Sequence, residues 1–84
     1  MFNAKVYISL KEGVADPQGA TIKHALDSLG FKGVNEVKTG KYFQIELNIK
    51  NKREAEKQIE DMCKKILVNP VIEKYEYEIE EIKR

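Results

Sequence analysis

The sequence is short of the residues that carry most enzyme chemistry. Its 84 residues include one cysteine, one histidine and no tryptophan. A single cysteine excludes an internal disulfide, and Cys63 has no second cysteine at a metal-ligand spacing. The 5 glycines never fall into a phosphate-loop or dinucleotide-binding spacing. The sequence therefore predicts no catalytic, cofactor-binding or metal-binding residue in this chain.

A strong net charge and a long apolar run are missing as well. Lys and Arg number 15 and Asp and Glu number 14, so no basic field indicates a nucleic-acid partner. No apolar run approaches the length of a membrane span, and the N-terminus lacks the apolar core of a signal peptide. We expect a soluble, cytoplasmic protein that forms one domain over residues 1–84. A domain of this size has a thin core, which a partner would help to cover.

Three stretches alternate between apolar and polar residues, as half-buried strands do. They are residues 2–10, 43–49 and 72–79. A shorter candidate strand at 34–38 is followed by Thr39-Gly40, which suits either a hairpin turn or a bulge. If these two residues form only a bulge, the short strand and the strand after it merge into one.

Two stretches between the strands have the apolar spacing of helices. The first begins at Asp16-Pro17, a capping residue followed by a proline suited to the first helical position, and ends at Gly30. The second begins at Asn51 and ends at Asn69-Pro70. The expected inward stripes are Ile22, Ala25, Leu26 and Leu29 in the first helix, and Ala55, Ile59, Met62, Cys63, Ile66 and Leu67 in the second. The order β-α-β-β-α-β predicts an α+β fold of ferredoxin-like type, an antiparallel sheet with two helices on one face.

Three features could suggest a reactive site, and each has a simpler interpretation. His24 lies opposite the apolar stripe of its helix and is interpreted as a surface residue. Cys63 lies within an apolar stripe and is interpreted as a small buried hydrophobic residue. Glu76, Glu78 and Glu80 share one strand face, where a solvated face is favoured over a cation site.

Taken together, several segments spread over nearly the whole chain give it a family resemblance. The more specific ones are Lys11-Glu12-Gly13-Val14, Asp16-Pro17-Gln18-Gly19 and Asn69-Pro70-Val71-Ile72-Glu73. The others are Val6 to Leu10, His24-Ala25-Leu26, Leu29-Gly30, Val37, Gly40-Lys41-Tyr42, Met62-Cys63, Leu67 and Tyr75. In these segments the chain resembles PurS, the small subunit of phosphoribosylformylglycinamidine synthase.

The resemblance implies a role in purine biosynthesis without an active site in this chain. PurS acts with a glutaminase subunit and a synthetase subunit that uses ATP and Mg, and it bridges the two and helps ammonia to pass. Exposed strand edges and the thin core, together with the resemblance, predict a homodimer or a dimer of dimers. The residues alone leave open a second class, a small-molecule-sensing module of the same fold.

The densest part of the resemblance, residues 11–19, has almost no core pattern of its own. Helix capping explains Asp16 and Pro17 but not the polar residues around them. Loops carry much of the function of small domains. We therefore expect a partner interface that consists of Lys11, Glu12 and Gln18, with Gly40, Lys41 and Tyr42 beside them.

Overall fold

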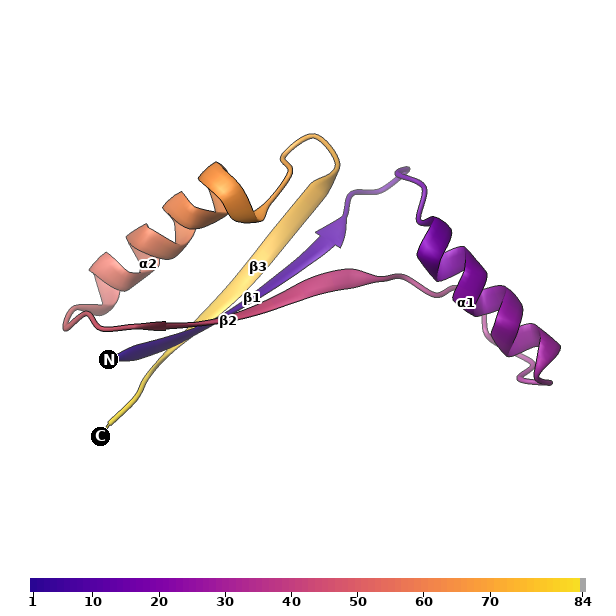
Figure 1. Cartoon of the computed structure of the whole chain (residues 1–84), viewed down its shortest axis with the longest axis horizontal. Coiled ribbons are helices and arrows are strands. Elements are labelled where there is room, and N and C mark those ends of the chain that lie inside the picture. The colour runs from indigo at the N-terminus through magenta and orange to yellow at the C-terminus, as the bar shows by residue number, and fades with distance from the viewer. Residues whose placement is uncertain (84) are drawn as a thin grey trace.

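The fold is a three-stranded antiparallel sheet in which a helix follows each of the first two strands (Figure 1). The computed structural model describes residues 1–83. Its elements are β1 (Phe2–Leu10), α1 (Pro17–Ser28), β2 (Gly40–Leu47), α2 (Lys52–Met62), the short π-helical turn η1 (Cys63–Leu67) and β3 (Glu73–Glu81). Both β2 and β3 pair with β1, which is the central strand. The predicted α+β class, with an antiparallel sheet and alternating helices, is confirmed.

The core lies between α2 and one side of the sheet, here called the inner face. Alternation along β1 places Phe2, Ala4, Val6 and Ile8 on this face, and all four side chains are buried. The predicted stripe of the second helix supplies the other half of the core, including Ala55, Ile59 and Cys63. Asn51 caps α2 as predicted, because its Oδ1 accepts a hydrogen bond from the Arg53 amide at 2.8 Å.

The predicted strand at 34–38 does not form, and Thr39-Gly40 is neither a hairpin turn nor a bulge. The second strand begins only at Gly40, which pairs with Ser9. The Thr39 amide donates instead to the carboxylate of Asp16 at 2.7 Å. The pairing of β1 with β2 therefore ends at Ser9 and Gly40. Residues 34–38 form no strand because β1 ends at Leu10 and leaves them no partner.

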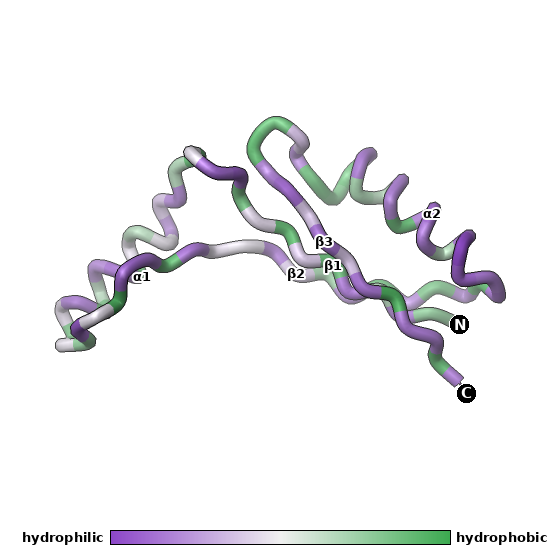
Figure 2. The backbone as a smooth tube through the Cα atoms, turned by 180° about the vertical axis from the view of Figure 1, so that it is seen from behind, coloured by the Kyte–Doolittle hydropathy of each residue, from purple (hydrophilic) through white to green (hydrophobic). Residues whose placement is uncertain are grey.

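The prediction that both helices lie on one face of the sheet holds for α2 only. In Figures 1 and 2, α1 projects beyond the end of the sheet instead of packing on it. Gly19 is the one buried residue of α1, and Ile22 and Leu29 of its apolar stripe are 39% and 74% exposed. The radius of gyration is 16.7 Å, against about 12 Å expected for a compact chain of this length. Residues 11–39 thus form an arm whose apolar stripe is largely uncovered by the other residues of the described range 1–83.

The C-terminal end of the second helix also departs from the predicted stripe. Residues 63–67 form a π turn, whose wider winding shifts the side chains relative to an α-helix. Ile66, predicted to face inward, is 80% exposed, while Val68 just beyond the turn is buried. An α-helical period of 3.6 cannot anticipate this shift.

The contact of α2 with the inner face predicts the effect of truncating its central residue. Ile59→Ala should lower the free energy of unfolding by about 2–5 kcal/mol, because it removes buried methylene groups and leaves a cavity. Denaturant unfolding measures this difference. The control is Gln58→Ala, at an exposed position next to it, which should change stability by about 0.5 kcal/mol or less. Equal effects of the two substitutions would contradict this account of the core.

Candidate interaction site

The carboxylate of Asp16 joins the two ends of the arm where they meet the sheet. Asp16 Oδ1 accepts from the Gly19 amide at 2.9 Å, which caps α1 as predicted. Its Oδ2 accepts from the Thr39 amide at 2.7 Å, and the Thr39 hydroxyl lies 2.9 Å from Oδ1. A side chain at Gly19 would overlap the Val37 carbonyl oxygen, so only glycine permits this approach. We call this set of contacts the Asp16 latch.

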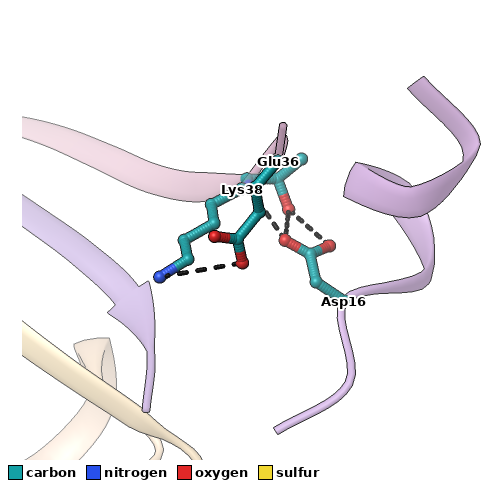
Figure 3. A network of polar contacts seen from close by, with 4 residues as sticks. Asp16, Glu36 and Lys38 are labelled. Carbon is teal, nitrogen blue, oxygen red and sulfur yellow. Dashed lines mark hydrogen bonds and ion pairs between the residues drawn. The ribbon is translucent and has the colours of Figure 1, made fainter. Parts of the chain in front are cut away.

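The latch holds Asp16 in its charged form. Hydrogen bonds from the Thr39 amide and then the Gly19 amide keep the pKa of this carboxyl below its ordinary value of 3.8. Beside it, Lys38 Nζ and Glu36 Oε1 form a looser pair at 3.9 Å (Figure 3). Both ends of the arm are therefore fixed at one charged group, although the arm buries little apolar surface.

Lys11 fixes the loop of residues 11–15 to the segment that precedes β3, at the same end of the sheet. The Lys11 amide donates to the Ile72 carbonyl at 2.8 Å, and its Nζ donates to the Pro70 carbonyl at 2.6 Å. Gly13 has a φ of 80°, a conformation that favours glycine and turns the chain back toward α1. Glu12 lies exposed at the turn between these fixed points.

Lys41 is held by a buried carboxylate that the sequence pattern did not single out. Glu73 is 8% exposed; its Oε1 accepts from the Asn69 amide at 2.8 Å, and its Oε2 lies 3.2 Å from Lys41 Nζ. The Asn69 hydrogen bond, followed by Lys41, lowers the pKa of this carboxyl. The available signal was the position of Glu73 just after the Asn69-Pro70 turn, where a side chain can bond to the turn amide.

The structure brings five of the six predicted interface residues to one end of the sheet. Lys11 and Glu12 line a hollow of about 350 Å³. Gln18, Gly40 and Lys41 line a neighbouring hollow of about 440 Å³. Asp16 and Thr39 line both hollows, so the latch is the wall between them.

Tyr42 is the residue that the structure separates from the other five. Successive strand residues point to opposite faces, so Lys41 lies on the inner face and Tyr42 on the other. The Tyr42 ring packs beside that of Tyr7, with 5.2 Å between the ring centroids.

Cys63 and His24, the two residues that could have suggested a reactive site, lie in the surroundings expected of non-catalytic residues. Burial, followed by the charge of Glu60, raises the pKa of the Cys63 thiol, which favours the unreactive protonated form. His24 lies exposed on α1, as predicted for a surface residue. Within residues 1–83, no three His, Cys, Asp or Glu side chains are grouped so that they could hold a metal ion. Over the same residues, neither helix has the length and apolar character needed to cross a membrane.

The geometry is that of a small α+β domain with an open sheet and an uncovered apolar stripe on its arm. Exposed polar side chains lie at one end of the sheet, where the Asp16 latch and Glu73 hold the backbone in place. The arm, with its exposed apolar stripe, projects from the same end. Comparison with known proteins makes the assignment specific: the family model of PurS, phosphoribosylformylglycinamidine (FGAM) synthase, matches residues 3–81. The chain belongs to the PurS family.

Individual relatives agree over nearly the full length. The PurS subunit of phosphoribosylformylglycinamidine synthase from Archaeoglobus fulgidus is 54% identical over 72 residues, 86% of this chain and 90% of the relative. The crystal structure of Methanocaldococcus jannaschii PurS, a subunit of a purine biosynthetic enzyme, superposes with a TM-score of 0.89 at 46% identity, covering 99% of this chain and 100% of the other. A chain in the structure of PurLQS from Thermotoga maritima superposes with a TM-score of 0.86 at 31% identity, covering 93% and 95%.

The family assignment makes the chain a PurS-type subunit of phosphoribosylformylglycinamidine synthase, an enzyme of purine biosynthesis. Of the two classes that the residues left open, it selects the enzyme subunit over the small-molecule sensor. The six interface residues remain a prediction, because likeness in sequence and fold does not identify the contacts of this chain.

The latch predicts a pH-dependent loss of stability. Asp16→Ala should lower the melting temperature at neutral pH by about 5 °C, because a cap and the contacts to Thr39 are lost. The pKa of Asp16 is lowered, so the stabilisation is fully present above its ordinary value of 3.8 and is lost as pH falls through the lowered pKa. The difference between the two proteins should be constant above about pH 5 and shrink below about pH 4.

Thermal unfolding followed by circular dichroism measures this difference at each pH. The control is Asp27→Ala, which removes a half-exposed carboxylate that lies 3.0 Å from Lys23 Nζ. It should shift the melting temperature much less, because exposed ion pairs stabilise weakly. A loss for Asp16→Ala that stays the same from neutral pH to pH 2 would contradict the latch.

Proposed function

We propose that this chain joins the glutaminase and synthetase subunits of phosphoribosylformylglycinamidine synthase and thereby assists ammonia transfer between them. The observation that carries the proposal is the likeness of nearly the whole chain to a chain of the Thermotoga maritima PurLQS structure. The exposed polar end of the sheet supports it, because side chains held by fixed backbone contacts bind a partner with a small entropic cost.

In this proposal the chemistry belongs to the partner subunits. The glutaminase hydrolyses glutamine and releases ammonia. The synthetase, with ATP and Mg, activates the amide oxygen of formylglycinamide ribonucleotide, which ammonia then replaces. This chain holds the two subunits in a fixed relation, so that ammonia passes between their sites. A cytoplasmic location fits the single free thiol of Cys63, since reducing compartments maintain free thiols.

The proposed contact is the end of the sheet where the two hollows lie. Lys11, Glu12 and Gln18 are exposed there, and Lys41 is fixed beside them by Glu73. Lys11 donates to a neutral carbonyl, so its positive charge is not neutralised by that bond. Such pre-positioned polar groups give specificity to an interface.

We also propose that the chain is a homodimer or a dimer of dimers. The arm exposes Leu29 and Phe31, which are 74% and 56% accessible. In the η1–β3 loop, whose tip is green in Figure 2, Val71 is 79% exposed, and Ile66 in η1 is 80% exposed. A second copy would cover both apolar areas, because a two-fold interface brings the arm of each copy onto the other.

The interface residues can be tested by removing three side chains together. The triple variant Lys11→Ala, Glu12→Ala, Gln18→Ala should remain folded and oligomeric but assemble poorly with the other two subunits. Glutamine-dependent synthesis by the reconstituted complex should fall by about tenfold or more, because several contacts of one interface are lost. Full activity would place the interface elsewhere.

The helix α2 offers a matched control for this experiment. The variant Glu56→Ala, Lys57→Ala, Gln58→Ala removes the same three residue types from α2, away from the two hollows. It should assemble and support synthesis as the unmodified chain does. Equal losses in the two triple variants would show that any loss of surface polarity disturbs assembly.

The arm can be tested by sedimentation. The unmodified chain should sediment as a dimer or tetramer at micromolar concentration. The double variant Leu29→Asp, Phe31→Asp should weaken self-association by about tenfold or more, because it places charges in an apolar contact. The control Asn35→Asp adds a carboxylate to the same arm at an exposed polar position and should leave self-association unchanged. A monomeric unmodified chain, or an unaffected double variant, would contradict the proposal.

A further inference from the structure

The face of the sheet opposite α2 is not covered by a helix within residues 1–83 (Figure 1). We call it the outer face. Tyr7 of β1 lies on it, directly between Tyr42 of β2 and Glu76 of β3 in the strand register. The three side chains therefore form one row across the sheet, at right angles to the strands.

The two tyrosines of this row form an exposed aromatic pair. Their ring centroids are 5.2 Å apart and their planes are inclined by 35°. Tyr7 is 42% exposed and Tyr42 is 52% exposed, so much of each side chain remains in contact with solvent. Rigid, partly exposed tyrosines are among the side chains that contribute most at protein interfaces, because they bury a large area with little loss of rotamer entropy.

The outer face next to the aromatic pair is acidic. The side chains that β3 places there between residues 76 and 80 are Glu76, Glu78 and Glu80. Two lysines share this face. Lys5 lies 3.8 Å from Glu80, and Lys74, which pairs with Ser9 in the register, lies next to Glu76 along β3. Glu76, beside Tyr7, is the carboxylate nearest to the aromatic pair in the register.

We propose that the outer face binds a basic surface of a partner subunit, with an Arg or Lys side chain seated on the Tyr7–Tyr42 pair and paired with Glu76. A cation over an aromatic ring is attracted by the ring's π electrons, and a neighbouring carboxylate adds a charge-assisted hydrogen bond. This inference rests on the proposed function, and it adds a second contact surface and the chemistry of the partner that fits it.

Charge selects this occupant over the alternatives. Nucleic acid and anionic membranes would be repelled by the glutamate column. Two copies of the outer face would bring two acidic columns together, with the two lysines Lys5 and Lys74 of each face set against three glutamates of β3. A basic protein surface satisfies both the carboxylates and the aromatic rings. It also accounts for a sheet face that combines exposed tyrosines with repeated glutamates.

The test measures binding of the unmodified chain and its variants to the purified glutaminase and synthetase subunits of the same organism. Tyr7→Thr with Tyr42→Thr keeps strand-forming residues but removes the rings. Glu76→Lys reverses the charge of the key carboxylate. Each variant should weaken binding to one of the two subunits by about tenfold or more. Glu76→Gln should reduce the sensitivity of that binding to salt, because one charge pair is lost.

The charge control is Asp61→Lys, which makes the same change in charge at an exposed position of α2. It should bind within about twofold of the unmodified chain. Circular dichroism should show that every variant is folded.

The remaining outcomes separate this inference from the proposed function. Unchanged binding by the tyrosine and Glu76 variants would overturn the inference, as would tighter binding by Glu76→Lys. A change in oligomeric state with unchanged binding would assign the outer face to a second copy and also overturn it. No binding by the unmodified chain to either subunit would overturn the proposed function itself.

Discussion

The packing of one helix on one face of a three-stranded sheet is the constraint on which the rest of this structure depends. Nine apolar residues, from Phe2 to Val68, make up the buried core, and none of them belongs to the arm. A core of this size cannot also cover α1, so the arm is positioned by polar contacts at its base. Because hydrogen bonds and helix caps each contribute little net free energy, an arm held in this way has a defined direction but an uncovered apolar stripe.

The sequence predicted the elements that obey a simple period and missed those that depend on a distant partner. Alternation identified β1 and β3 with nearly their observed bounds, and capping residues identified the starts of both helices. The apolar stripe of α1 was also real, but its packing partner was wrongly expected to be the sheet of the same chain. Periodicity shows which side of a helix is apolar and does not show which molecule covers it.

Each remaining difference between the predicted and the observed structure can be traced to a particular contact or turn. Thr39 gives its amide to Asp16, 23 residues away, so the predicted strand before it has no ladder to join. The π turn after Met62 moves Ile66 outward. Glu73 was missed as a positioning residue because its second partner, Lys41, is distant in sequence and lies beside it only in the folded chain. The loop part of the candidate site could be proposed from the sequence because neither capping nor a core pattern explained Lys11, Glu12 and Gln18.

Strand alternation also explains how so small a chain can present two different contact surfaces. Lys41 and Tyr42 are neighbours in sequence, yet Lys41 joins the charged cluster around Glu73 and Tyr42 joins Tyr7 on the outer face. The proposed role of joining two subunits requires two separate surfaces, and a sheet covered by a helix on only one face leaves room for both in a short chain. A second helix on the outer face would give a larger core but would bury the Tyr7–Tyr42–Glu76 row. The thin core and the open sheet are therefore two aspects of one architecture, in which α2 buries one face of the sheet and the other face stays exposed.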